Sequence, residues 1–170
     1  MPSNLYSQVN DSAILADPPP KLLSEYGFFV NTKDQITVPG VLPYELITSL
    51  FSDYADKHRF VYVPKGKIAA YQKNSVFSFP VGSVLIKTFS YEPINNQTSG
   101  RHLIETRLLI RKDSGWDALT YVWDEEGQEA SLALAGKTVK ANYISNDGRE
   151  LDISCLLYTS PSPRDQRGSR

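Results

Sequence analysis

The stretch that decides the predicted fold is residues 104–123, which read IETRLLIRKDSGWDALTYVW. Apolar and charged side chains alternate through residues 104–110, as they do in a strand with one buried face. Asp-Ser-Gly at 113–115 then predicts a hairpin turn. Every second residue from Leu119 to Trp123 is apolar or aromatic, so the next segment is also expected to be a strand with one buried face. The stretch therefore predicts an antiparallel hairpin.

Short segments rich in β-branched and aromatic residues lie on both sides of this hairpin and are separated by turn residues. They are residues 60–63, 67–71, 76–79, 84–91, 129–134, 138–143 and 149–153. This rhythm predicts a mainly β fold, an antiparallel β-sandwich or barrel-like domain with disordered ends. One or two short N-terminal helices are expected as well. Residues 21–26 fit one helical turn that Gly27 ends, and residues 43–54 fit either a short helix or an irregular buried segment.

Length and composition describe an ordinary globular chain. The 170 residues suggest one domain, and 41% hydrophobic with 22% charged residues excludes wholesale disorder. Lys and Arg number 18 against 19 Asp and Glu, so there is no overall basic excess for nucleic acid or an anionic membrane. No apolar run is long enough for a transmembrane helix. The single cysteine excludes a disulfide framework and a thiolate metal cluster.

The two ends of the chain differ in texture from the middle. Residues 1–20 are polar, end in Asp-Pro-Pro-Pro and show no signal peptide, so we expect an extended or disordered lead before a β-rich domain over 21–154. Residues 155–165 (CLLYTSPSPRD) resemble, codon by codon, the translation of a transposase-type sequencing adapter. We therefore expect 155–170 to be a non-native disordered tail. Without its three arginines and one aspartate, 15 basic and 18 acidic residues remain, a net charge of −3.

Catalytic and metal-binding constellations are weak in this sequence. No Gly-x-Ser-x-Gly elbow is present, and only His58 and His102 could act as imidazole bases. A structural histidine is the favoured interpretation of His102. The acidic residues between 124 and 129 are expected to form a solvated hairpin rather than a calcium site. Glu105 and Arg107 share a strand face and are best explained as a cross-strand ion pair.

Several ordered motifs together resemble a known family. They are residues 25–29 (EYGFF), 40–44 (GVLPY), 50–55 (LFSDYA), 57–64 (KHRFVYVP), 79–89 (FPVGSVLIKTF), 105–110 (ETRLLI), 115–116 (GW) and 121–124 (YVWD). This set resembles the N-terminal region of a bacterial family of diheme c-type cytochrome proteins, over roughly residues 22–153.

The resemblance implies a periplasmic or outer-membrane-associated protein in which a β-rich N-terminal region precedes Cys-x-x-Cys-His haem attachment sites. This sequence contains no such motif. We therefore expect no haem and no metal in this fragment, and haem c in a longer gene product. The implied partners are the missing C-terminal haem module and a redox partner protein, without nucleic acid.

The first functional hypothesis is thus an accessory β-domain for haem-based electron transfer that has no catalytic activity of its own. One alternative is a carbohydrate- or small-ligand-binding β-sandwich module that uses aromatic residues such as Trp116 and Trp123. The other is part of an enzyme of unknown reaction. The residues considered for a functional cleft are His58, Arg59, His102, Glu105, Arg107 and Trp123.

Overall fold

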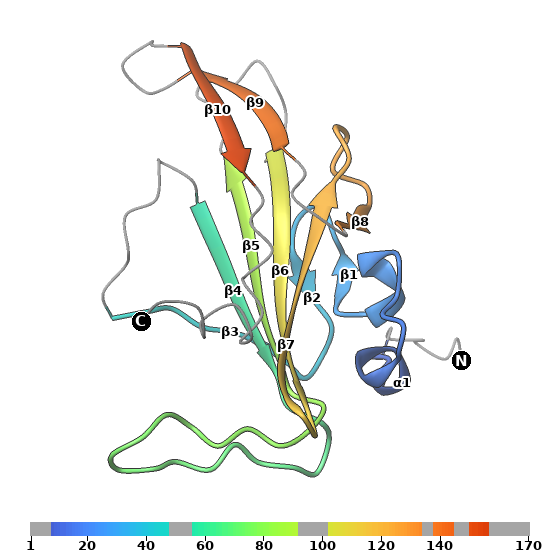
Figure 1. Ribbon diagram of the computed structural model, residues 1–170, viewed down its shortest axis with the longest axis vertical. Coiled ribbons are helices and arrows are strands. Elements are labelled where there is room, and N and C mark those ends of the chain that lie inside the picture. Colours follow the sequence, from blue (N-terminus) through green and yellow to red (C-terminus); the bar gives the residue numbers. More distant parts are fainter. Residues whose placement is uncertain (1–7, 48–55, 92–101, 134–137, 145–149, 157–170) are drawn as a thin grey trace, which may run out of the picture.

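The computed structural model describes residues 8–47, 56–91, 102–133, 138–144 and 150–156, the last two ranges by their backbone alone. Its main element is a six-stranded sheet in which every strand runs antiparallel to its neighbours and the spatial order follows the chain (Figure 1). The strands are β3 (Val41–Pro43), β4 (Asp56–Tyr62), β5 (Val84–Tyr91), β6 (His102–Lys112), β7 (Gly115–Trp123) and β8 (Ala130–Leu132). The prediction of a mainly β, antiparallel fold is confirmed.

Two further strand pairs flank this sheet in the sequence. β1 (Phe29–Asn31) pairs antiparallel with β2 (Ile36–Thr37), and β9 (Thr138–Ile144) pairs antiparallel with β10 (Glu150–Leu156). In the second pair, Cys155 lies opposite Val139 and Leu156 lies opposite Thr138. The strand therefore continues two residues into the segment expected to be a tail, and residues 157–170 lie outside the described part of the chain.

The N-terminal residues form structure where a lead was expected. Helix α1 (Asp11–Leu15) begins after Asn10, whose side-chain oxygen accepts a hydrogen bond from the Ala13 amide at 3.2 Å. Ile14, in this helix, is 1% exposed and belongs to the core. The expectation of an extended lead over 1–20 is thus wrong at residues 11–15, because a capped helical turn presents an apolar residue to the sheet.

The single helical turn predicted over 21–26 is confirmed as the 3₁₀ helix η1 (Leu23–Tyr26). Gly27 ends it in the left-handed region, with φ of +68°. A side chain at this position would also place its Cβ 2.7 Å from the Gln8 carbonyl oxygen. Gly27 therefore allows the end of η1 to lie directly against Gln8 and Asn10, which brings α1 and η1 together.

The alternation predicted from the sequence gives the sheet one apolar face, which the N-terminal segments cover. Ile86 and Leu108 on this face are fully buried, as are Leu23 and Phe28 from the covering layer. We call this the core face of the sheet. The layer also protects the edge of β8, since the Leu132 amide donates to the Lys21 carbonyl at 2.8 Å.

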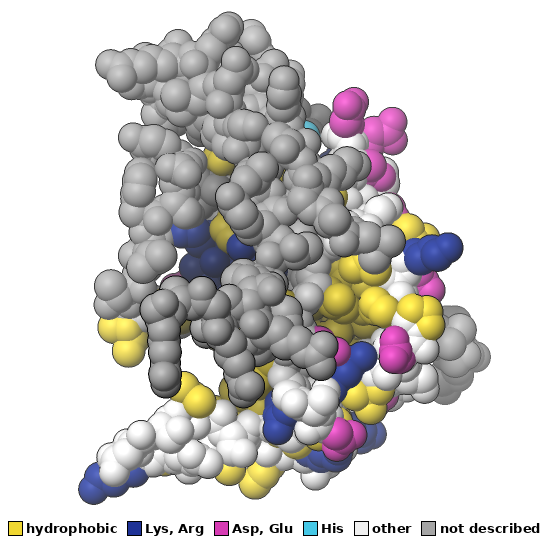
Figure 2. Space-filling model, in the orientation of Figure 1, with side chains coloured by type: hydrophobic (Ala, Val, Ile, Leu, Met, Phe, Trp, Pro, Cys, Tyr) yellow, Lys and Arg dark blue, Asp and Glu magenta, His cyan; other side chains and the backbone are white. Residues whose placement is uncertain are grey.

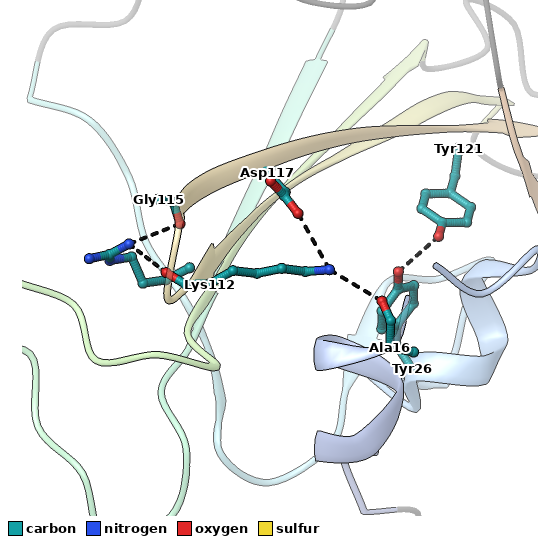
Figure 3. Close-up of polar contacts among 7 residues, drawn as sticks. Ala16, Tyr26, Lys112, Gly115, Asp117 and Tyr121 are labelled. Carbon is teal, nitrogen blue, oxygen red and sulfur yellow. Dashed lines mark hydrogen bonds and ion pairs between the residues drawn. The ribbon is translucent and has the colours of Figure 1, made fainter. Parts of the chain in front are cut away.

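Polar contacts at two places fasten the layer to the sheet (Figure 3). The Tyr121 hydroxyl donates to the Pro20 carbonyl at 2.8 Å, so its oxygen accepts the proton of the Tyr26 hydroxyl at 2.9 Å. Burial raises the pKa of both tyrosines, which keeps both hydroxyls protonated. At the other end, Lys112 Nζ lies 3.2 Å from the Ala16 carbonyl and 3.4 Å from Asp117 Oδ2.

Two sequence predictions differ from the structure. The start of the helix considered over 43–54 is extended instead, because Val41–Pro43 pairs with β4, and Leu46 and Ile47 are exposed. Residues 48–55 lie outside the described part. The strands predicted at 67–71 and 76–79 are reduced to one bridge between Ala70 and Ser78. No helix in the described ranges is long and apolar enough to cross a membrane.

Replacing Tyr121 with Phe should destabilise the fold more than replacing Tyr26 with Phe. Tyr121→Phe leaves both the buried Tyr26 hydroxyl and the Pro20 carbonyl without a partner, and we expect a loss of about 2–3 kcal/mol in the free energy of unfolding. Tyr26→Phe removes one hydrogen bond and keeps the other, for a loss of about 1 kcal/mol. Urea denaturation of both variants measures the difference. Equal losses would contradict the hydrogen-bond relay that runs from Tyr26 through Tyr121 to Pro20.

Candidate functional site

The face of the sheet opposite the core face carries charged side chains in register. On this outer face, Arg59 of β4 lies directly opposite Lys87 of β5, and Lys87 lies directly opposite Arg107 of β6. We call these three residues the basic row. Like charges placed opposite each other on neighbouring strands repel, so the row is an unfavourable arrangement for folding alone.

An aromatic ring and one carboxylate stand beside the basic row. In the adjacent register position, Phe89 of β5 lies opposite Lys57 and Glu105. Lys87 Nζ is 4.5 Å and Arg107 Cζ is 5.1 Å from the centre of the Phe89 ring. Cation–π attraction to the shared ring offsets part of the repulsion between the two cations.

Glu105 is the carboxylate of this site and is almost entirely buried, with 1% exposure. Its Oε1 accepts from Arg107 Nε at 2.7 Å and lies 2.6 Å from Nη2. The expected ion pair thus forms, although it runs along β6 rather than across strands. Burial raises the pKa of Glu105, while Arg107 and Lys87 oppose that shift. Its Oε2 is buried and has no hydrogen-bond partner among the described residues.

A β-bulge lies next to this carboxylate. Phe89 pairs with Glu105 and Ser90 pairs with Leu103, so Ile104 is an extra residue in β6. Bulges bend a strand and change the direction of neighbouring side chains, and they often occur beside functional sites. Here the bulge lies next to the position where Lys57, Phe89 and Glu105 stand opposite one another. It interrupts the regular strand pairing at the edge of the charged site.

The electrostatics of the site favour a bound anion. The pKa of Lys87 is lowered, first by burial and then by the charges of Arg59, Lys57 and Arg107, while Glu105 acts in the opposite direction. Among the described residues, the Glu105 carboxylate is the acidic group that lies beside the three cations of the basic row. A carboxylate or phosphate group at the basic row would relieve the repulsion and would accept charge-assisted hydrogen bonds.

The structure brings together some of the six residues considered for a cleft and separates others. Arg59, Glu105 and Arg107 share the outer face. His102, at the start of β6, is exposed and pairs with Tyr91 beyond the bulge. His58 and Trp123 belong to the core face, because they alternate with Arg59 and Val122. The six residues therefore do not form one cleft, since the sheet itself divides them.

The two core-face residues have structural partners there. His58 Nε2 lies 3.1 Å from Ser90 Oγ, and Trp123 Nε1 donates to Thr106 Oγ1 at 3.0 Å. A serine and histidine in contact are also the first two members of a nucleophilic site. Ser90, however, has 0% exposure, so its hydroxyl is inaccessible to a substrate in this fold.

The two tryptophans lie on different faces of the sheet. Trp116 is 42% exposed on the outer face, whereas Trp123 is buried on the core face, so the two indoles do not share a binding surface. Within the described residues, no group of three His, Cys, Asp or Glu side chains could hold a metal ion.

Sequence reasoning missed Lys87 and Phe89 as members of the site. Both lie at alternate positions of the predicted strand over 84–91, so their shared face could have been inferred. Their alignment with Arg59 and Arg107 could not, because the pairing register of separate strands is a tertiary property. Figure 2 shows Lys and Arg side chains, in dark blue, gathered over β4 and β5.

No family model, curated protein or solved structure matches this chain.

Replacing Lys87 with Gln should stabilise the fold. At neutral pH the variant no longer has a partly buried charge that is repelled by the neighbouring cations. We therefore expect a gain of about 0.5–1 kcal/mol in the free energy of unfolding. The gain should vanish above the ordinary lysine pKa of 10.5, because Lys87 is then neutral in both folded and unfolded chains. Lys73→Gln, at an exposed position, is the control and should change stability by less than about 0.5 kcal/mol. A destabilised Lys87→Gln variant would contradict the electrostatic description of the row.

Proposed function

We propose that this chain is an accessory docking domain of a c-type cytochrome-like electron-transfer protein, and that the basic row is the surface on which it receives an anionic group. The domain itself carries no catalytic step and no haem. In this proposal the haem module lies in a longer gene product and acts in the periplasm or at the outer membrane, as the family resemblance implies.

The observation that carries the docking proposal is the register of Arg59, Lys87 and Arg107 across three neighbouring strands. A fold without a binding role gains nothing from three aligned cations, since the arrangement costs stability. Residues retained at the expense of stability are common at binding surfaces, where an incoming partner compensates the repulsion. An anionic partner is therefore the chemistry that suits this face.

The resemblance and the row coincide in the chain. Arg59 lies within the motif at 57–64, Lys87 within the motif at 79–89, and Arg107 within the motif at 105–110. Haem presents propionate carboxylates at one edge, and guanidinium groups bind carboxylates through paired hydrogen bonds. We propose that the row receives such carboxylates, with the Phe89 ring providing an apolar contact beside them.

Catalysis is not part of the proposal because the described residues do not combine an accessible nucleophile with a base. His58 contacts the inaccessible Ser90, and Glu105 lies on the other face of the sheet. The carbohydrate-binding alternative is not favoured either, since Trp116 and Trp123 lie on opposite faces.

The cytochrome part of the proposal is tested on the uninterrupted gene product from the same source. We expect that product to contain covalently attached haem, because the family pattern places Cys-x-x-Cys-His motifs after the β-rich region. Haem staining of a denaturing gel and the pyridine haemochrome spectrum both measure it. Absence of covalent haem in the full-length product would overturn this part and leave the anion-binding part standing.

The docking part is tested with the chain and a haem c peptide that has free propionates. Trp fluorescence quenching should report binding that weakens with salt, and we expect Lys87→Gln or Arg59→Gln to weaken it by about tenfold. The matched ligand control is the same haem peptide with esterified propionates, which should bind much more weakly. Lys33→Gln, outside the sheet, is the matched protein control.

Two results would contradict docking at the basic row. One is equal affinity for the free and esterified peptides, because the carboxylates would then play no part. The other is a Lys87→Gln variant that binds as tightly as the wild type while remaining folded.

A further inference from the structure

The chain between β4 and β5 forms an extended arm, which we define as residues 64–83. Figure 1 shows it leaving the ends of these two strands and projecting sideways from the sheet. One bridge joins its two sides, with Ala70 and Ser78 exchanging both amide–carbonyl hydrogen bonds at 2.9 Å. Every residue from 65 to 78 except Ala69 is exposed. The arm therefore buries little of its own surface in this chain.

The exposed part of the arm is unusually apolar. Ile68 is 82% exposed, Tyr71 74%, Val76 83% and Phe77 53%. Scattered exposed apolar residues are normal, but four in one short segment form a patch that usually has a binding partner.

Two of these apolar side chains pack together. Tyr71 and Phe77 contact each other, with ring centres 5.9 Å apart. Residues 65–78 are exposed apart from Ala69, so this segment is open to its surroundings along its whole length. A lipid interface surrounds an inserted segment, and it would therefore cover all four apolar side chains at once.

The charge of the arm has one sign. It contains Lys65, Lys67 and Lys73 and no Asp or Glu, although the whole chain has a net charge of −1. Figure 2 shows dark-blue side chains at the outer end of this projection and yellow side chains along it. Basic residues beside exposed aromatic and aliphatic residues are the pattern of elements that bind an anionic membrane surface.

The base of the arm is fixed to the sheet, so binding of the arm to a surface would also position the sheet. The Gly82 amide donates to the Arg111 carbonyl and the Arg111 amide to the Ser83 carbonyl, both at 2.8 Å. Phe79 contacts both Phe77 and Trp116, with ring centres 6.3 and 5.7 Å apart. Insertion of the outer part would thus hold the sheet at the membrane surface.

We propose that the arm is a membrane-binding element that inserts Ile68, Tyr71, Val76 and Phe77 into the interface of an anionic bilayer. Its three lysines lie at the level of the lipid phosphates. The exposed segment has fewer residues than the roughly 20–30 a side of a stable protein interface, which also favours lipid over a protein partner. This inference is independent of the docking function proposed for the basic row.

The test is co-sedimentation of the chain with vesicles of phosphatidylcholine and phosphatidylglycerol, compared with phosphatidylcholine alone. We expect binding to the mixed vesicles that weakens as salt rises. Changing Lys65, Lys67 and Lys73 together to Gln should lower the partition coefficient on the order of 100-fold at low salt.

Apolar insertion is tested by the combined variant Ile68→Ser, Val76→Ser and Phe77→Ser, which should lower the partition coefficient by more than about tenfold. The matched control is Leu42→Ser with Ile36→Ser, which removes exposed apolar side chains outside the arm and should leave binding unchanged. A Phe77→Trp variant should show a blue-shifted emission on binding and quenching by brominated lipid.

Three outcomes would overturn the proposal, each for chain shown to be folded by circular dichroism. The first is no binding of the wild type to mixed vesicles. The second is loss of vesicle binding in Lys87→Gln with full binding in the arm variants, which would assign the lipid surface to the basic row. The third is that the arm variants still bind vesicles but no longer bind a protein partner of the wild type. Failure of haem-peptide binding affects none of these results.

Discussion

The structure depends on the covering of one sheet face by the N-terminal segments. Ile86, Leu108 and their neighbours can leave water only because α1 and η1 pack against them, and hydrophobic burial is the main stabilising contribution in a domain of this size. The Tyr26–Tyr121–Pro20 relay gives that packing a defined geometry, because buried hydroxyls must keep their hydrogen-bond partners. Residues 8–20 are therefore part of the domain.

Because one face of the sheet packs against the core, the alternate residues of each strand lie on the opposite, outer face. This is why Arg59, Lys87 and Arg107 meet on the outer face, where their charges can reach a partner. Their repulsion is reduced by the Phe89 ring and by the buried Glu105, but both compensations are partial. The proposed docking function and the electrostatic cost of the row are thus two consequences of the same register.

The arm adds a second surface with different chemistry. Net charge indicated no affinity for an anionic membrane, because the acidic residues elsewhere in the chain balance the basic ones. Residues 57–91 nevertheless contain six Lys and Arg residues and no Asp or Glu, and part of this excess lies on the arm beside exposed apolar side chains. Local segregation of charge, rather than the total, decides which surface can bind lipid.

The sequence by itself determined the antiparallel β class, the strand at 84–91, the hairpin within 104–123 and the helical turn ended by Gly27. These features follow from periodicity, turn residues and backbone preferences, all of which are local. Only the tertiary structure decided that His58 and Trp123 face the core, that Asn10 caps a helix in the expected lead, and that Lys87 aligns with two arginines. Those outcomes depend on cross-strand register and on which segment covers which face, and both are fixed by contacts between residues far apart in the chain.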